Sequence, residues 1–325
     1  MSNSKFNISI IIVNYKSWKP LELCLKSIAE ISSSNLKLET IIIDNCSNDH
    51  RLNDFKKKFS DFSFFVNSGN NGFANGCNLG AKKASGEYLL FLNPDTIVTE
   101  APIYKMVRYL EANINFGIVS CQQKNETSFE KTHRFFPDFH TLFGFLRALN
   151  KNYLFNKIKK KDEVLFPDWV SGAVVCISRR WFDKINGWNE DYWMYFEDVD
   201  FSKKVRNSGG EVALLTDTEI IHNHGGSSRI NIKTAVTTKT EVIISKHVYI
   251  RNHFTGIKHF ILQFLVVSTT FFSKLIIALL GLIFFFILKF RLDLFLFFKV
   301  LKYYIFAIIN QTWLSDKSMN HQNKK

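Results

Sequence analysis

The first 95 residues alternate short apolar runs with polar segments. The runs are rich in β-branched and aromatic residues, which is typical of buried parallel strands, and they lie at 6–13, 38–43, 62–66 and 87–92. A helical stretch follows the first run, with Leu21, Leu25 and Ile28 on one face. A second helix runs to about Ala84. Strand–helix alternation at this spacing predicts a doubly wound α/β sheet with ligands at the carboxyl ends of its strands.

The second half of the pattern is less regular. Residues 121–165 have no clean period, and we expect them to leave the sheet. Regular structure resumes at 168–178, and a helix starts near Arg179. Residues 197–207 have a helical period, and 211–221 should return as a strand that ends at His222.

The C-terminal region combines apolar runs with basic residues. Residues 275–288 are continuously apolar, but 14 residues make a helix of only about 21 Å, short of the ~30 Å hydrocarbon core. Extension back to Ile261 would place Lys274 near the middle of a membrane, at a cost of about 2.5–3.5 kcal/mol. Residues 290–308 resemble a helix in the membrane interface, with one basic side formed by Arg291, Lys299 and Lys302. We therefore expect monotopic attachment rather than spanning. A helical pair that covers the α/β domain, or a homodimer contact, is the alternative.

Length and charge support a division of the chain into an α/β domain and a C-terminal membrane-association region. A chain of 325 residues accommodates one large α/β domain plus an appendage, and we place the boundary at 1–255 and 256–325. Residues 246–325 hold eleven Lys and Arg against Asp293 and Asp316, so +9 of the net charge of +13 lies there. A basic and apolar segment favours an anionic membrane surface over nucleic acid. The five cysteines form no CxxC pair, which indicates reduced thiols rather than zinc ligands or disulfides.

Acidic and histidine residues recur at the ends of the predicted strands. Each alone could be a helix cap, a turn or a surface side chain, but their order along a doubly wound pattern indicates a site formed by Asp44, Asp95, Glu197 with Asp198, and His222 with His224. Carboxylate, amide and imidazole groups can hold a divalent cation, and a carboxylate can act as a general base. Residues 69–80, GNNGFANGCNLG, let backbone approach a ligand. They match neither GxGxxG nor GxxxxGK[ST], which argues against a dinucleotide dehydrogenase and a P-loop.

Five motifs in order resemble those of the family 2 glycosyltransferases. The donor half is represented by SIIIVNYKSW, IIIDNCSND and GNNGFANGCNLGAKKASGEYLLFLNPDT. The acceptor half is represented by WVSGAVVCISRRWFDKINGWNEDYWMYFEDVDFSKKVRNSG and then HNHGGSS. The resemblance covers residues 8–255 and is nearest to the rhamnosyltransferase-like enzymes of O-antigen and capsule assembly. It implies the GT-A fold, a Rossmann-like, mostly parallel sheet, here with a C-terminal helical membrane-associated appendage.

The resemblance also implies a donor site. Three consecutive residues at the end of the first strand would hold the nucleotide base, and they are Val13, Asn14 and Tyr15. Asp44 would bind the base or the ribose, and Gly72 and Asn78 would border the donor.

A metal site follows from the same resemblance. The family's DXD motif corresponds to Asn93-Pro94-Asp95, where Asn93 replaces one carboxylate. Asp95 would then be the main ligand to the donor-bound Mg²⁺ or Mn²⁺. His222 would be the third contact, and His224 could assist.

The acceptor half carries the implied catalytic residues. Glu197 and Asp198 match the family's ED motif, and Asp198 is our candidate base, with Glu197 next to it. The turn at 187–189 and Trp193 would frame the acceptor, although ordinary aromatic packing explains them equally well.

The expected function is inverting transfer of rhamnose or a similar sugar from a dTDP- or UDP-sugar. The acceptor would be a polyprenyl-diphosphate-linked or surface glycan, at the cytoplasmic face of the bacterial inner membrane. One alternative is a non-catalytic membrane scaffold that binds sugar nucleotides. Another is a sugar nucleotidyltransferase, which would need a basic, Gly-rich loop where VNYKSWKP has no glycine.

Overall fold

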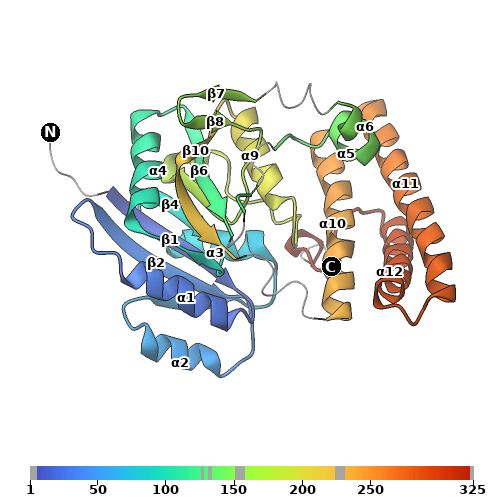
Figure 1. The fold of residues 1–325 in the computed structure, drawn as a ribbon, viewed down its shortest axis with the longest axis horizontal. Coiled ribbons are helices and arrows are strands. Elements are labelled where there is room, and N and C mark those ends of the chain that lie inside the picture. The colour runs from blue at the N-terminus through green and yellow to red at the C-terminus, as the bar shows by residue number, and fades with distance from the viewer. Residues whose placement is uncertain (1–5, 126–127, 131–133, 151–157, 224–230, 323–325) are drawn as a thin grey trace. The chain divides into compact units, whose positions relative to one another are not determined.

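A computed structural model describes residues 6–125, 128–130, 134–150, 158–223 and 231–322 (Figure 1). The chain divides into two compact units, which are considered separately. Unit 1 consists of Met1–Asn189 and Glu197–Gly226. Unit 2 consists of Glu190–Phe196 and Ser227–Lys325. The chain therefore crosses between the units three times.

The N-terminal half of unit 1 is a parallel sheet, as predicted. Its strand order is β3-β2-β1-β4, with β1 (Phe6–Asn14), β2 (Leu36–Asp44), β3 (Ser63–Val66) and β4 (Tyr88–Leu92). The connecting helices are α1 (Trp18–Ala29), α2 (Arg51–Lys58) and α3 (Phe73–Lys83). Side chains of β1 alternate between two cores, because Ile10 packs with residues of α1 and Ile11 with residues of α3. Burial on both faces explains the continuous apolar runs.

The second half makes the sheet mixed. An antiparallel strand, β9 (Val174–Ser178), lies between β4 and β6 (Phe116–Lys124). Parallel to β6 runs β10 (Glu211–His222), followed by antiparallel β8 (Val164–Phe166) and β7 (Lys159–Lys161). The other helices in the described residues of unit 1 are α4 (Glu100–Ala112), α5 (Phe139–Leu142), α6 (Gly144–Leu149), α8 (Arg179–Lys184) and α9 (Glu197–Asn207). The predicted α/β doubly wound fold is confirmed.

One prediction about this half was wrong. Residues 121–165 were expected to leave the sheet, but β6 continues to Lys124, and β8 pairs with β10 through Leu165 and Val164. The carboxyl end of β6 carries Gln122 and Gln123 in place of apolar residues. These polar residues interrupt the apolar run by which a strand is predicted, although Gln123 is buried in the structure.

A two-residue strand, β5 (Thr96–Ile97), sets the geometry of the sheet's carboxyl edge. It pairs antiparallel with the end of β10, so that Thr96 lies opposite His222. The main-chain N–H of Asn223 donates to the carbonyl of Asp95 (3.0 Å). The chain leaving β4 is thus folded back onto β10, which brings Asp95 to His222.

Unit 2 contains α10 (Ile232–His253), α11 (Gly256–Ile283), α12 (Leu288–Ile309) and the short α13 (Met319–Gln322). Buried His247 of α10 contacts Gln263 Oε1 of α11 through Nδ1 (2.5 Å) and Tyr304 Oη of α12 through Nε2 (3.2 Å). Burial lowers the pKa of His247 to about 4, so the ring is neutral and can donate to Gln263 while it accepts from Tyr304. One uncharged imidazole therefore connects the three long helices.

The predicted helix over 275–288 was wrong at both ends. The helix begins at Gly256 and ends at Ile283, and residues 284–287 turn the chain into α12. Two helices form a hairpin, because Phe271 of α11 contacts Phe297 of α12 and an added Cβ at Gly281 would lie 2.8 Å from the carbonyl oxygen of Phe290. Within the described residues, α11 is the one helix long and apolar enough to cross a membrane.

Candidate active site

The ends of β1 and β2 carry the residues predicted to hold the nucleoside. Asn14 donates through Nδ2 to Asp44 Oδ1 (3.2 Å), and both side chains are buried. Asp44 also accepts from the main-chain N–H (2.9 Å) and hydroxyl (2.5 Å) of Ser47. Val13 is buried, whereas the ring of Tyr15 is exposed. Their contacts with a nucleoside remain predictions.

The glycine- and asparagine-rich loop leads into α3 through a network of amides. Asn45 donates to the carbonyl of Gly72 (2.9 Å), and Asn67 donates to Asn45 Oδ1 (2.9 Å). Gly72 precedes α3 at φ +92°, a conformation that a side chain would strain. The loop is thereby held by its own amide groups at the start of a helix.

Asn78 of α3 engages the turn at Trp188. Its Nδ2 donates to the Trp188 carbonyl and its Oδ1 accepts from the Trp188 N–H, both at 2.9 Å. The indole of Trp188 stacks on Phe201 of α9, with ring centroids 4.0 Å apart. These bonds join α3 to α9, while the predicted donor contact of Asn78 stays a prediction.

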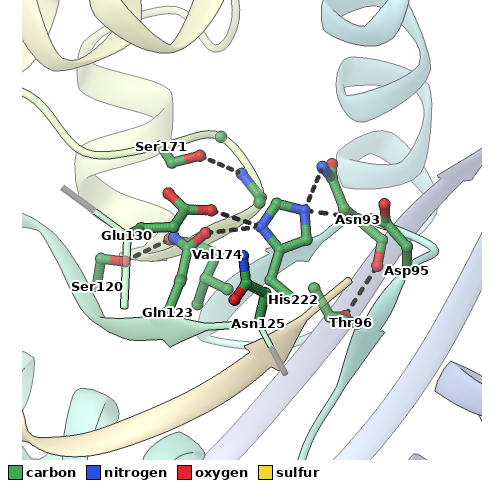
Figure 2. A network of polar contacts seen from close by, with 12 residues as sticks. Asn93, Asp95, Thr96, Ser120, Gln123, Asn125, Glu130, Ser171, Val174 and His222 are labelled. Atoms are coloured by element: carbon green, nitrogen blue, oxygen red, sulfur yellow. Dashed lines mark hydrogen bonds and ion pairs between the residues drawn. The ribbon is translucent and has the colours of Figure 1, made fainter. Parts of the chain in front are cut away.

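His222, at the end of β10, is the centre of a buried polar cluster (Figure 2). Its Nδ1 lies 2.8 Å from Glu130 Oε1 and 3.0 Å from Gln123 Oε1. On the other side of the ring, Nε2 lies 3.3 Å from Asp95 Oδ1 and 3.5 Å from Asn93 Nδ2. The fold thus brings together the three residues predicted to bind metal. His224 lies outside the described residues.

The two carboxylates control the charge of His222. Burial lowers the pKa of the imidazole, but hydrogen bonds and charge interactions with Asp95 and Glu130 outweigh burial and raise the pKa to about 9. Asp95 Oδ1 is buried and lies 3.3 Å from Nε2 of His222. His222 is therefore protonated at neutral pH when no cation competes.

Glu130 and Gln123 were missed by the sequence analysis. Glu130 lies in the segment without a period, about ninety residues before His222, so no local signal links them. Gln123 at the end of β6 carried the one available signal, a polar side chain at the carboxyl end of a parallel strand.

The cluster suits a divalent cation chemically, although no group of three or more His, Cys, Asp and Glu side chains in the described parts of the chain is arranged to hold one. Glu130 or Gln123 can accept the Nδ1 proton, which leaves the Nε2 lone pair of neutral His222 facing Asp95. With the Asn93 amide beside them, Asp95 and His222 offer oxygen and nitrogen donors of the types that Mg²⁺ and Mn²⁺ accept.

Glu197 and Asp198 occupy the first turn of α9. Asp198 Oδ2 accepts from the N–H of Gly172 (3.1 Å), and Oδ1 from the N–H of Val199 (2.8 Å). Burial raises the pKa of Asp198, although the Gly172 bond opposes it. Burial, and secondarily the charge of Asp198, raises the pKa of Glu197 to about 8. Raised pKa values suit proton acceptors that act near neutral pH.

The His222 cluster predicts a pH-dependent stability. Because the pKa of His222 is about 9 when folded and about 6.5 when unfolded, its contribution is complete below pH 6.5 and is lost as pH rises through 9. The free energy of unfolding can be measured with urea in the presence of a chelator. From pH 6 to pH 9.5, the wild-type protein should lose about 2–3 kcal/mol more of this free energy than His222→Gln does. Equal losses in both proteins would refute this assignment.

Comparisons with known proteins identify the family of this chain. The model of Glycosyl transferase family 2 matches residues 9–182, and that of the N-terminal domain of galactosyltransferase matches residues 154–224. The chain is 26% identical to the low-salt glycan biosynthesis hexosyltransferase Agl10 of Haloferax volcanii over 227 residues, 67% of each protein. It is also 26% identical to rhamnosyltransferase WbbL of Escherichia coli over 146 residues, 43% of this chain and 54% of WbbL.

A crystal structure of GalNAc-T7 with UDP, GalNAc and Mn²⁺ has the same fold. The TM-score is 0.55 at 17% identity, over 74% of this chain and 48% of that one. The chain thus spans about half the length of WbbL and of GalNAc-T7. Because the first family model covers more than half of the sequence and includes all three donor motifs, the chain belongs to glycosyltransferase family 2.

Proposed function

We propose that this protein transfers a sugar from a nucleotide-diphosphate donor to a glycan acceptor with inversion at the anomeric carbon. The observation that carries the proposal is the pair of carboxylates at the start of α9, of which Asp198 is oriented by the Gly172 N–H. A fixed carboxylate with a raised pKa is the group that a single displacement requires.

In the proposed reaction, Asp198 accepts the proton of the acceptor hydroxyl as the oxygen attacks the anomeric carbon. The bond from that carbon to the nucleotide diphosphate breaks on the opposite face, which inverts its configuration. Glu197 is the alternative base, since burial also raises its pKa, to about 8. Asp198 and Glu197 are therefore alternative candidates for the base, and substitution of each in turn can distinguish them.

Asp95, His222 and Asn93 would hold a divalent cation beside the donor diphosphate. The cation would supply positive charge to the leaving group. GalNAc-T7, which shares the fold, was crystallised with UDP and Mn²⁺. Glu130 would keep the Nδ1 proton of His222 in place, so that Nε2 remains a ligand. Asp44 and Asn14 would bind the nucleoside, together with Val13, Tyr15, Gly72 and Asn78.

The relatives guide the choice of substrates. WbbL is named a rhamnosyltransferase and Agl10 a glycan hexosyltransferase. We therefore propose rhamnose or a related hexose, delivered from a dTDP- or UDP-sugar, for the synthesis of a cell-envelope polysaccharide. The acceptor would be a polyprenyl-diphosphate-linked glycan presented at the cytoplasmic face of the membrane.

The hairpin of α11 and α12 supports attachment to that membrane. Large apolar side chains are exposed along α11 and across the turn, where Phe286 is 79% exposed. Lys299 of α12 donates to Thr237 of α10 (2.7 Å). The residues of α12 before that contact make a helix of about 17 Å, roughly half of the hydrocarbon core. We therefore propose that the hairpin enters one leaflet and that attachment is monotopic.

The base can be tested by substitution. Asp198→Asn should lower turnover by about 10²–10⁴-fold, because the acceptor proton loses its carboxylate. Donor binding, read as a thermal shift, should persist. Asp183→Asn, at an exposed position on α8, is the matched control. Near-normal transfer by Asp198→Asn would exclude that residue and direct attention to Glu197→Gln. Donor binding without transfer by the original protein would instead indicate a scaffold.

The metal site has a separate test. Asp95→Ala should abolish the additional thermal stabilisation that Mn²⁺ gives to the donor complex, and His222→Ala should reduce it less. Since the cation competes with a proton on His222, the stabilisation by Mn²⁺ should grow from pH 7 to pH 9. Asp217→Ala, at a surface site of β10, should change nothing. Full activity in excess chelator would eliminate metal assistance.

Membrane attachment can be measured by flotation with vesicles. The full chain should bind anionic vesicles, be released in part by high salt and be released more fully by detergent, because lipid charge and apolar insertion both contribute. Phe286→Ser should weaken binding by about 10–100-fold, since burial of Phe is worth about 1.5–3 kcal/mol. Ile114→Ser, at an exposed position of unit 1, should leave binding to the vesicles unchanged. Failure to bind either neutral or anionic vesicles would contradict attachment, and a C-terminal tag exposed on the far side would indicate spanning.

A further inference from the structure

The segment Glu190–Phe196 belongs to unit 2, although the residues before and after it belong to unit 1. Its last two residues, Tyr195 and Phe196, have φ values of +71° and +65°. Bulky residues rarely adopt this left-handed conformation, and two in succession persist only where their surroundings hold them. The next residue is Glu197, and Asp198 follows.

Within this segment, the carboxylate of Asp191 is bonded to two other regions of unit 2. Its Oδ1 accepts from Asn320 Nδ2 (2.8 Å). Its Oδ2 accepts from Asn252 Nδ2 (3.1 Å) and lies 3.5 Å from Nη2 of Arg251. The donors come from the end of α10 and from α13, near the end of the chain.

The remainder of the segment is held by the same two regions. On α10, Ser245 donates to the carbonyl of Met194 (2.9 Å), and the Tyr249 ring contacts that of Phe196 (6.0 Å between centroids). From the C-terminal region, the ammonium of Lys317 lies 4.0 Å from the centre of the Trp193 ring. These contacts therefore extend to Phe196, the second residue of the strained pair.

The C-terminal region is itself anchored within unit 2. The hydroxyl of Tyr303 donates to the carbonyl of Trp313 (2.9 Å), and that of Ser315 donates to buried Glu241 (3.3 Å). The ring of His321 packs on Phe306 (5.3 Å between centroids). The residues after α12 thus form a fixed support for Asp191.

We propose that Asp191 is a positioning residue for sugar transfer, fixed by α10 and by Asn320. By holding Glu190–Phe196, it sets the backbone conformation through which the chain reaches Glu197 and Asp198. This inference rests on the proposed function of the carboxylate pair. It assigns the C-terminal residues a role in catalysis that is independent of membrane attachment.

The test compares four variants of the full chain in detergent: Asp191→Ala, Asp191→Asn, Asn320→Ala and, as the matched control, Asn310→Ala. Asn310 is exposed in the same unit, directly follows α12 and donates to the Phe306 carbonyl. Transfer is measured as kcat and donor KM, with dTDP-rhamnose and UDP-sugars as probes. Hydrogen exchange of residues 190–198 reports on the segment directly.

Asp191→Ala should lower kcat by about 10–100-fold, the range expected when a catalytic group is displaced by about an ångström. Asn320→Ala should lower kcat by roughly 3–10-fold, since it removes one of the bonds. Donor KM should stay within about twofold in both, and exchange of 190–198 should accelerate. Asp191→Asn should keep most of the wild-type activity. The side-chain oxygen of the new amide can still accept from Asn252, and its NH₂ group can donate to Asn320 once the Asn320 amide has flipped.

Normal kcat in Asp191→Ala and Asn320→Ala would overturn the proposal, provided that Asp198→Asn is inactive in the same assay. That result would leave the proposed function intact. A fall in activity that only follows the loss of folded protein would also overturn it, and so would unchanged exchange of 190–198. If the original protein transfers no sugar, the proposed function fails instead, and the exchange measurement still decides whether Asp191 holds the segment.

Discussion

The pairing of β5 with the end of β10 is the constraint on which the site depends. Only two residue pairs form it, yet they reverse the chain after β4 and place Asp95 beside His222. Thr96 is fully buried in this turn, and its hydroxyl donates to the Asn93 carbonyl (2.8 Å). Without this reversal, residues more than 120 positions apart would have no reason to meet.

A buried imidazole between two carboxylates would be costly unless each charge had a partner. His222 satisfies this condition through Asp95 on one side and Glu130 on the other. A divalent cation in place of the Nε2 proton would add one positive charge to this cluster, and the proposed donor diphosphate would offset it.

Unit 2 uses polar contacts for a different purpose. Neutral His247 links three helices from the inside, and Asp191 links α10 to the C-terminal residues. Both arrangements require directional bonds, whereas the exposed apolar surface of α11 has no such requirement. The unit therefore combines an interior held by directional bonds with an exposed apolar surface, the surface for which we propose membrane attachment.

The sequence by itself determined the strands and helices of the first half, because strands buried on both faces must be continuously apolar. It also determined the family, since the ordered motifs carry the resemblance. Only the tertiary structure decided that Glu130 and Gln123 contact His222, that 284–287 form a turn, and that Asp191 contacts Asn320. These facts depend on pairing between distant residues, and a local pattern of hydrophobicity carries no information on which polar side chain will meet which.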